Sequence, residues 1–359
     1  MNETPIKNGA RMQMTDQGAV SLDELRSNAV VLEVRRTVLE LCTSKDAIIA
    51  AVSGGRDSVA LATSLATLSD AGHIAAVTIG HVHHHRRPEA DDEAALVEET
   101  AARLRLPFAI RHLDEDPHAT PAQLRASRYE ALEAIASASQ APMIATAHQA
   151  QDQLETVIAA IVRGTGPRGL VGMPAIRPLS DNVSLVRPML EVDRSAAGEL
   201  CSLAGLTWCD DPTNTDPETL RGLLRRDVLP VLESLRPGVA SRLASGTAVR
   251  AAASLALDEA VVRPQEMDDD AVQWSRHSLA DVGKGLCQAS LMATARSMVG
   301  GADGLSSASI LSATTAILDT RQHRRVFELG CGVVAIVDAM RVRMQILAST
   351  QPIESRPPK

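Results

Sequence analysis

The chain has 359 residues, of which 45% are hydrophobic and 22% are charged, and its formal net charge is −8. This length predicts two domains, and this composition is typical of a soluble globular protein and excludes a disordered chain. The negative net charge excludes a uniformly basic nucleic-acid-binding surface. With two Trp, one Tyr and two Phe, the chain also lacks the aromatic residues of a platform on which RNA bases stack.

The N-terminal segment 1–28 is polar, and we expect it to be a flexible leader. It has no apolar signal segment, and no part of the chain reaches the roughly 18 consecutive apolar residues of a membrane helix. The five cysteines are widely spaced and form no C-x-x-C pair, which indicates a reducing compartment and predicts no zinc or iron–sulfur site. We therefore expect a cytoplasmic protein with no membrane partner.

Between Ala47 and Ala204, short apolar runs alternate with helical patterns. The runs lack polar alternation, as expected for strands that are covered on both faces, and they are Ala47–Val52, Ile74–Ile79, Phe108–Ile110 and Met143–Ala147. The helix candidates between them are Val59–Leu68, Asp91–Leu104 and Gln123–Ala136. This order predicts an α/β fold with a doubly wound parallel sheet, whose ligands bind at the carboxyl ends of the strands.

The second half of the chain predicts a smaller α+β domain. Helices are expected near Arg194–Ala204 and Thr219–Leu235, and the acidic run Glu266 to Asp270 is expected to be a linker or loop, because like charges repel. Further helices are predicted at Lys284–Met298 and Ser307–Leu318, followed by strands at Arg325–Leu329, Val333–Val337 and Arg341–Leu347. We place the domains at 29–235, including a helical extension, and at 240–350.

The first strand runs directly into Ser53-Gly54-Gly55-Arg56-Asp57-Ser58 and then into a helix. Glycines let the backbone approach a phosphate, and the N–H groups at the start of the helix point toward an anion. Asp57 fits such an anion site if a Mg²⁺ ion bridges it to the phosphates. The alternative is an ordinary strand-to-helix turn in which Ser and Asp cap the helix.

Another polar group follows the fourth strand, where His148, Asp152 and Glu155 lie at helical positions i, i+4 and i+7. These positions share one edge of a helix. An imidazole and two carboxylates on one edge suit an ammonium group, a Mg²⁺ ion or both. The alternative is a helix cap followed by a solvated face.

The ordered combination of blocks from Ile48 to Pro230 resembles the tRNA(Ile)-lysidine synthetase family of ATP pyrophosphatases. The matching blocks are the Ser53–Ser58 loop, His81 to Glu89, Arg125 to Tyr129, Ala147 to Thr156, Arg163 to Met173, Arg187 to Leu190 and Asp211 to Asn214. The C-terminal part is similar to the family's small substrate-binding domain only in its order of helices and strands.

The resemblance implies a two-step ligation on the wobble cytidine of tRNA(Ile) with a CAU anticodon. ATP first adenylates the 2-oxo oxygen of the cytidine, and the ε-amino group of free L-lysine then displaces AMP to form lysidine. ATP and Mg²⁺ are the implied cofactors. The C-terminal domain would bind the tRNA, and a homodimer is compatible with the sequence.

Site roles follow from the same resemblance. The implied ATP-binding residues are Ser53, Gly54, Gly55, Arg56, Asp57 and Ser58, with Asp57 as the metal ligand. The implied catalytic residues are Asp57, Arg128, His148, Asp152 and Glu155, of which Asp152 and Glu155 bind lysine. Contacts to substrate or RNA are expected from His84, Arg87, Arg125, Arg163, Gly164, Arg221 and Arg225.

Three positions depart from the family pattern: Gln149-Ala150-Gln151 replaces His-x-Asp, His85 stands where Gly is usual, and Gly222 where Asn is usual. Because a carboxylate is lost at Gln151, a degenerate ATP- or RNA-binding module without catalysis remains an alternative. A tRNA thiolase is a second alternative, because it would use the same loop, although the absence of C-x-x-C argues against a thiolase. His81, His83, His84 and His85 suggest a metal cluster. We consider metal binding the weaker interpretation, because in a strand His84 would face the opposite way from the other three, and no carboxylate or Cys lies at ligand spacing.

Overall fold

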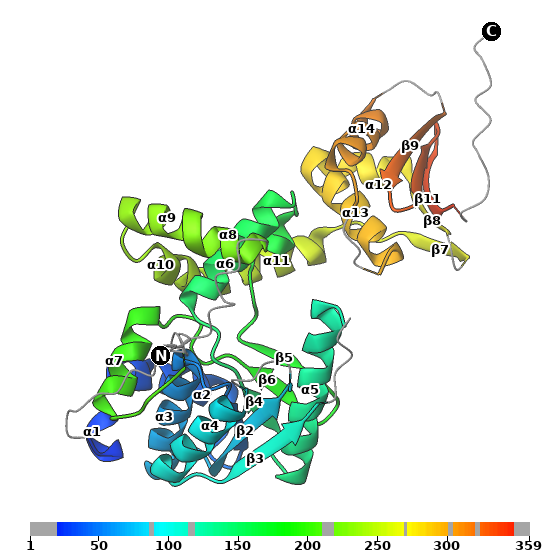
Figure 1. The fold of residues 1–359 in the computed structure, drawn as a ribbon. Coiled ribbons are helices and arrows are strands. Elements are labelled where there is room, and N and C mark those ends of the chain that lie inside the picture. Colours follow the sequence, from blue (N-terminus) through cyan, green and yellow to red (C-terminus); the bar gives the residue numbers. More distant parts are fainter. Residues whose placement is uncertain are drawn as a thin grey trace, which may run out of the picture. The chain divides into compact units, whose positions relative to one another are not determined.

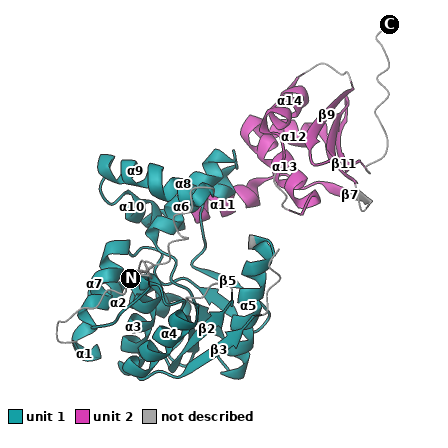
Figure 2. Ribbon diagram, viewed as in Figure 1, with its two compact units in different colours: residues 1–248 teal, residues 249–359 magenta. Residues whose placement is uncertain are grey.

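The computed structural model describes residues 20–85, 90–113, 119–209, 219–268, 271–300, 304–319 and 324–347. The chain divides into two compact units, residues 1–248 and 249–359 (Figure 2). Of the segment expected to be a leader, residues 1–19 lie outside the described part. Ser21 already caps helix α1 (Leu22–Leu25) and Leu25 is buried, so folded structure begins before residue 29.

A six-stranded sheet of order β3-β2-β1-β4-β6-β5 forms the centre of unit 1 within the described residues (Figure 1). All neighbouring strands are parallel except β5 and β6, which confirms the α/β fold with a parallel-dominated sheet. The strands are β1 (Ala47–Ala51), β2 (Ala76–His83), β3 (Phe108–His112), β4 (Met143–Ala145), β5 (Ile176–Pro178) and β6 (Ser184–Val186). The sequence predicted the first four and missed β5 and β6, which have three residues each.

Helices cover both faces of this sheet. On one face, Ile48 and Ala50 of β1 join a core that includes α2, α3, α4 and α7, and on the other face Ile49 packs with α5. The alternation of Ile48, Ile49 and Ala50 is the period of two that a strand imposes on its side chains. These helices are α2 (Ala29–Leu41), α3 (Arg56–Asp70), α4 (Ala90–Leu104), α5 (Pro121–Ala138) and α7 (Arg194–Leu203).

A helical extension completes unit 1 above the carboxyl ends of the strands. Ala150 and Leu154 of α6 (Ala150–Val162) pack against Ala240 and Ala244 of α10 (Val239–Ser245). The other members of the extension are η1 (Pro167–Leu170), α8 (Leu220–Leu223), the π-helix η3 (Leu224–Val228) and α9 (Leu229–Leu235). The predicted helix Thr219–Leu235 is therefore three consecutive segments, the middle one a π-helix. Helix α11 (Thr247–Ala260) spans the boundary between the units in the sequence.

Unit 2 has an antiparallel sheet of order β7-β8-β11-β10-β9 with its own core, which includes Trp274, Leu291 and Val342. Its elements are β7 (Gln265–Asp268), β8 (Ala271–Ser275), α12 (Arg276–Asp281), α13 (Gly283–Met298), α14 (Ser307–Leu318), β9 (Arg325–Gly330), β10 (Val333–Val337) and β11 (Arg341–Ile346). The prediction of a loop at the acidic run was wrong for its described part, since Gln265–Asp268 pairs with β8 as an edge strand. No helix in the described ranges has the length and hydropathy needed to cross a membrane.

Candidate active site

The loop between β1 and α3 has the backbone of a phosphate cradle. Gly54 adopts φ +89°, a conformation that only glycine enters without strain, and Gly55 caps α3. The Ser58 hydroxyl donates to the Gly55 carbonyl at 2.7 Å and accepts the Ser53 N–H at 3.2 Å. The Cys209 N–H donates to the Gly54 carbonyl at 2.9 Å and ties the loop to a distant segment. The start of α3 thus opens toward the carboxyl end of the sheet, as an anion site requires.

Helix α6 starts at the same sheet edge, after the neighbouring strand β4. The Gln149 N–H donates to Asp152 Oδ2 at 2.8 Å, so one oxygen of the Asp152 carboxylate caps its own helix. Thr146 Oγ1 and His148 Nδ1 lie 2.9 Å apart and fix the imidazole. Strand order reverses between β1 and β4, which is where parallel sheets of this kind bind ligands.

One pocket of about 750 Å³ lies between these two loops. It brings together most of the site residues expected from the sequence: Ser53, Gly55, Arg56, Asp57, Ser58, His84, Arg128, His148, Asp152, Glu155 and Arg225. The phosphate loop and the polar residues at the start of α6, which are separate features of the sequence, therefore line the same cavity. Its volume is within the range of small-molecule and cofactor sites.

Other expected residues lie outside the lining. Arg125 donates to the Tyr129 hydroxyl at 3.1 Å, and Arg221 is exposed on α8. Arg163 is exposed at the end of α6, and Gly164 follows it with φ +70°. Arg87 lies outside the described residues.

Arg225 occupies a position that the sequence did not suggest. We expected it to face RNA, whereas its side chain points into the pocket, where Nη2 donates to Asp152 Oδ1 at 2.9 Å and Nε to Glu155 Oε1 at 2.5 Å. The Glu155 side chain is 2% exposed. Burial raises the pKa of Glu155, and the bond to Arg225 opposes this shift. Arg225 comes from the π-helix, an irregularity that is frequent at functional sites.

Asp57 lies in a positively charged part of the pocket. Burial raises the pKa of its carboxyl, and Arg194 and Arg56 oppose that shift. Sequence reasoning missed Arg194, which α7 brings from more than a hundred residues away, because no local motif marks it. Its Nε is buried and has no hydrogen-bond partner within the described part of the chain. A buried cationic donor beside a phosphate cradle fits an anionic ligand such as a polyphosphate.

His148 and Arg128 line another part of the pocket, and further arginines lie outside the lining. Burial lowers the pKa of His148 to about 4, Asp152 opposes this shift, and Arg187, Arg125 and Arg128 reinforce it, so His148 is neutral at pH 7. Arg125, Arg128 and Arg177 each lie within 5.0–5.5 Å of the centre of the Tyr129 ring. Sequence reasoning did not single out Arg177, since its strand β5 was itself missed.

Two of the residues that depart from the family pattern, Gln151 and Gly222, have local structural roles. The Gln151 Nε2 donates to Asp193 Oδ2 at 3.0 Å, so Gln151 contacts the cap of α7 instead of supplying a carboxylate. The Gly222 N–H donates to Thr219 Oγ1 at 3.0 Å, which caps α8. Among the described residues, the carboxylates that line the pocket are Asp57, Asp152 and Glu155, together with Glu93 of α4.

The comparisons with known proteins agree with this geometry. Residues 28–232 match the PP-loop domain family. The chain is 39% identical over 235 residues to the tRNA(Ile)-lysidine synthase of Salinispora arenicola, a match that covers 64% of this chain and 70% of that protein. It is 36% identical over 210 residues to the enzyme of the same name from Chromobacterium violaceum, covering 58% of this chain and 47% of that protein.

A solved structure with a similar fold is the U34-tRNA thiolase NcsA from Methanococcus maripaludis, which carries a [4Fe-4S] cluster. The TM-score is 0.50 at 17% identity, over 61% of this chain and 76% of that one, which shows a shared fold. In the described part of this chain no disulfide joins any of the five cysteines, and none of them belongs to a group of three ligating side chains. The chain belongs to the PP-loop family and, within it, to the tRNA(Ile)-lysidine synthases.

Proposed function

We propose that this protein uses ATP to join free L-lysine to the wobble cytidine of tRNA(Ile) with a CAU anticodon. The observation that carries the proposal is the single pocket in which the phosphate loop faces the carboxylates of α6. Relatives that match 64% and 58% of this chain are named tRNA(Ile)-lysidine synthase. The family relationship supports ATP binding, and the pocket supports the assignment of its two ends to ATP and to lysine.

ATP would lie with its phosphates on the Ser53–Ser58 loop. The N-terminus of α3 and the guanidinium groups of Arg56 and Arg194 provide the positive potential that phosphates need. Asp57 and the hydroxyls of Ser53 and Ser58 are hard oxygen donors of the kind that Mg²⁺ prefers, so these residues would hold the ion. Bound there, Mg²⁺ would neutralise charge on the departing pyrophosphate.

In the first step, the 2-oxo oxygen of cytidine forms a bond to the α-phosphorus of ATP, and the bond to pyrophosphate breaks. Arg128 lines the pocket and carries a fixed positive charge that would stabilise the developing negative charge on phosphorus. In the second step, the lysine ε-amino nitrogen bonds to C2 of the base and loses a proton, and AMP leaves with the former 2-oxo oxygen. Neutral His148 adds no positive charge that would repel lysine.

Asp152 and Glu155 would hold the ammonium group of lysine. Both carboxylates are already paired with Arg225, so ammonium and guanidinium compete for the same oxygens. We propose that Arg225 releases them when lysine binds. The π-helix that carries Arg225 has a wider backbone turn than its neighbours, which suits a segment that must shift.

The direct test incubates purified protein with ATP, Mg²⁺, labelled lysine and tRNA(Ile) transcripts that carry a CAU or a GAU anticodon. Label should enter only the CAU transcript, and mass spectrometry should place lysine on its wobble cytidine. A family member of known activity serves as the positive control. Absence of label under conditions in which that control reacts would reject the proposal.

A further inference from the structure

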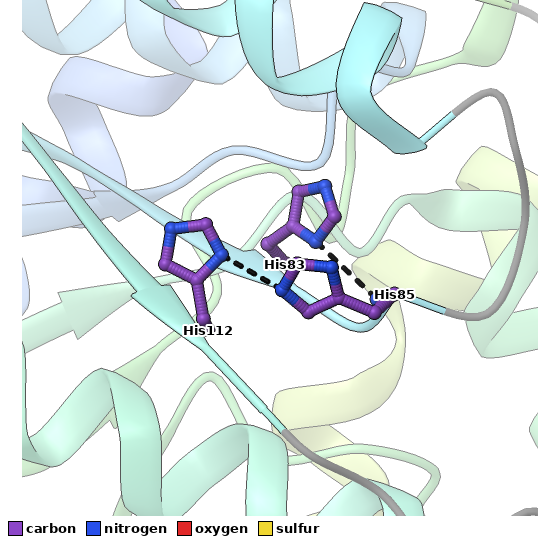
Figure 3. Close-up of side chains that lie close together, drawn as sticks. All are labelled: His83, His85 and His112. Carbon is purple, nitrogen blue, oxygen red and sulfur yellow. Dashed lines mark hydrogen bonds between the residues drawn. The ribbon is translucent and has the colours of Figure 1, made fainter.

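Three histidines gather at the carboxyl ends of β2 and β3, beside the pocket but outside its lining (Figure 3). His83 and His112 are the last residues of these parallel strands and are register partners, so their side chains leave the sheet on the same face. His85 follows two residues after His83. The ring centres are 3.9 Å apart for His83 and His85, 5.2 Å for His83 and His112, and 5.0 Å for His85 and His112.

The backbone of His85 is what folds its ring back onto the cluster. Its φ is +49°, in the left-handed region that non-glycine residues enter at a cost. This strained conformation brings the His85 ring against two other imidazoles.

Hydrogen bonds orient the three rings toward one another. The His83 Nε2 lies 3.0 Å from Asp91 Oδ1, and a donated N–H there leaves Nδ1 with its lone pair, which accepts the His85 N–H at 3.3 Å. The His85 Nε2 and His112 Nδ1 are 2.9 Å apart (Figure 3). A carboxylate behind a histidine is the usual arrangement that fixes the tautomer of a metal ligand.

The distances are close to those of a coordination sphere. One ligand atom from each of the three side chains lies within 4.8 Å of the other two. A zinc–nitrogen bond of about 2.0–2.1 Å places tetrahedral ligands roughly 3.3 Å apart. For an ion to bind, the 2.9 Å pair must open, the longer separations must close, and the His85 N–H must leave His83 Nδ1. The rings that must turn are the exposed ones, His85 and His112, since His83 is buried.

We propose that His83, His85 and His112 bind one divalent ion of the zinc class, through His83 Nδ1, His85 Nε2 and His112 Nδ1. Imidazole nitrogens select Zn²⁺, Co²⁺, Ni²⁺ or Cu²⁺ over Mg²⁺, so this ion is separate from the one expected at Asp57. Exposure of two ligands leaves the fourth tetrahedral position to water. The ion would cross-link the ends of β2 and β3, and through Asp91 it would connect to α4.

The test uses tag-free, full-length protein that has been stripped with chelator and returned to a buffer containing millimolar Mg²⁺. Co²⁺ is added while the visible absorption of tetrahedral cobalt is recorded, and Zn²⁺ is then added to displace it. We expect one equivalent of Co²⁺ to give the tetrahedral bands and one equivalent of Zn²⁺ to abolish them. A featureless Co²⁺ titration, or Zn²⁺ binding only to a mixture of weak sites, would overturn the proposal.

Variants separate the site from other ligands of the chain. His85→Gly is the sharpest, because glycine suits φ +49°, so loss of metal cannot be attributed to misfolding; we expect it and His112→Gln to lose the cobalt bands. Asp91→Asn should lower affinity by about 10-fold to 100-fold, as orienting carboxylates do. His277→Gln and Cys331→Ser, which remove an exposed imidazole and an exposed thiol elsewhere, should bind as the parent does. Unchanged binding by His85→Gly and His112→Gln would equally overturn the assignment.

Discussion

Asp57 and Asp152 lie in one pocket but have different surroundings, which predicts different consequences when each is removed. Asp57 follows the phosphate loop and faces Arg56 and Arg194, whereas Asp152 is paired with Arg225 and caps α6. We expect Asp57→Ala to lower tRNA-dependent pyrophosphate release by about 100-fold or more. Asp152→Ala should spare that step and depress lysine transfer. Pyrophosphate release in the absence of lysine measures adenylation, and incorporation of labelled lysine measures lysine transfer. If Asp152→Ala lost both activities equally, this division of roles would be contradicted.

His148 predicts a pH dependence of stability. Its pKa in the folded protein is about 4, below the ordinary value of 6.5, so between these values the unfolded chain binds a proton that the folded protein does not. Stability is therefore lost as pH falls from about 6.5 toward 4, by about 2 kcal/mol between pH 7 and pH 5. Urea unfolding at both pH values should show this loss in the parent relative to His148→Gln. The same pH dependence in both proteins would show that His148 is not the group responsible.

At the scale of elements, the π-helix η3 places Arg225 where lysine is expected to bind. If guanidinium and ammonium compete for Asp152 and Glu155, Arg225→Ala leaves two carboxylates facing the incoming ammonium group. We expect the KM for lysine to fall several-fold, with the KM for ATP as the internal reference. Arg226→Ala is the matched control, because Arg226 is the next residue of the π-helix, is exposed and pairs with Asp227 rather than with Asp152 or Glu155. A rise in the KM for lysine would instead make Arg225 part of the bound-lysine site.

In unit 2, Arg276 closes the carboxyl end of α14. It is 8% exposed and donates to the carbonyls of Ile317 at 3.0 Å, Ala316 at 2.9 Å and Asp338 at 3.0 Å. Arg276→Met keeps the length but leaves buried carbonyls without donors, so we expect a loss of about 2–4 kcal/mol in the free energy of unfolding of unit 2.

The two tryptophans report on different units, because Trp208 belongs to the core of unit 1 and Trp274 to that of unit 2. In a Trp208→Phe background, the Trp274 fluorescence transition of Arg276→Met should move to lower urea. Exposed Arg341→Met should stay within about 0.5 kcal/mol of the parent. An unchanged Trp274 transition in Arg276→Met would contradict the assignment of Arg276 to the stability of unit 2.

At the scale of the whole molecule, the net charge of −8 means that contacts to tRNA must be local. Arg163 and Arg221 are exposed on the helical extension of unit 1. If each contacts a phosphate, the logarithm of tRNA affinity should fall linearly with the logarithm of salt concentration, and each Arg→Ala change should reduce that slope by roughly 0.7–0.9.

Filter binding at several salt concentrations measures these slopes. Arg26→Ala is the matched control, because Arg26 is also exposed and lies outside the helical extension, where it pairs with Asp23 of α1 and Asp70 of α3. Equal slopes for the parent, Arg163→Ala and Arg221→Ala would remove the helical extension from the tRNA-binding surface. The tRNA-binding role of the segment 240–350 stays a prediction that the same assay can address with variants of its exposed arginines.

The sequence by itself determined the parts that depend on neighbours along the chain. The Ser53–Ser58 loop follows from a strand and a turn, and the placement of Asp152 and Glu155 follows from the helical repeat of α6. The prediction of one helix edge was wrong for His148, because α6 begins at Ala150 and His148 precedes its N-cap, Gln149. The sequence alone did not predict the short strands β5 and β6, because three residues are too few to show the alternating pattern of a strand. The edge strand β7 escaped because local charge repulsion was weighed without the partner strand that stabilises it.

Only the tertiary structure decided which distant groups meet. Arg225 reaches Glu155 across 70 residues, Arg194 comes to Asp57 from α7, and the register of β2 against β3 places His112 beside His83. From the sequence, a histidine metal cluster was weighed as if His81 to His85 formed one continuous strand. In the structure the chain turns at His85, and the third ring, that of His112, comes from the next strand. Sequence motifs record contacts made through the local backbone. The charge pairs and ligand sets of this protein depend on sheet order and helix packing, which the long-range burial of apolar side chains fixes.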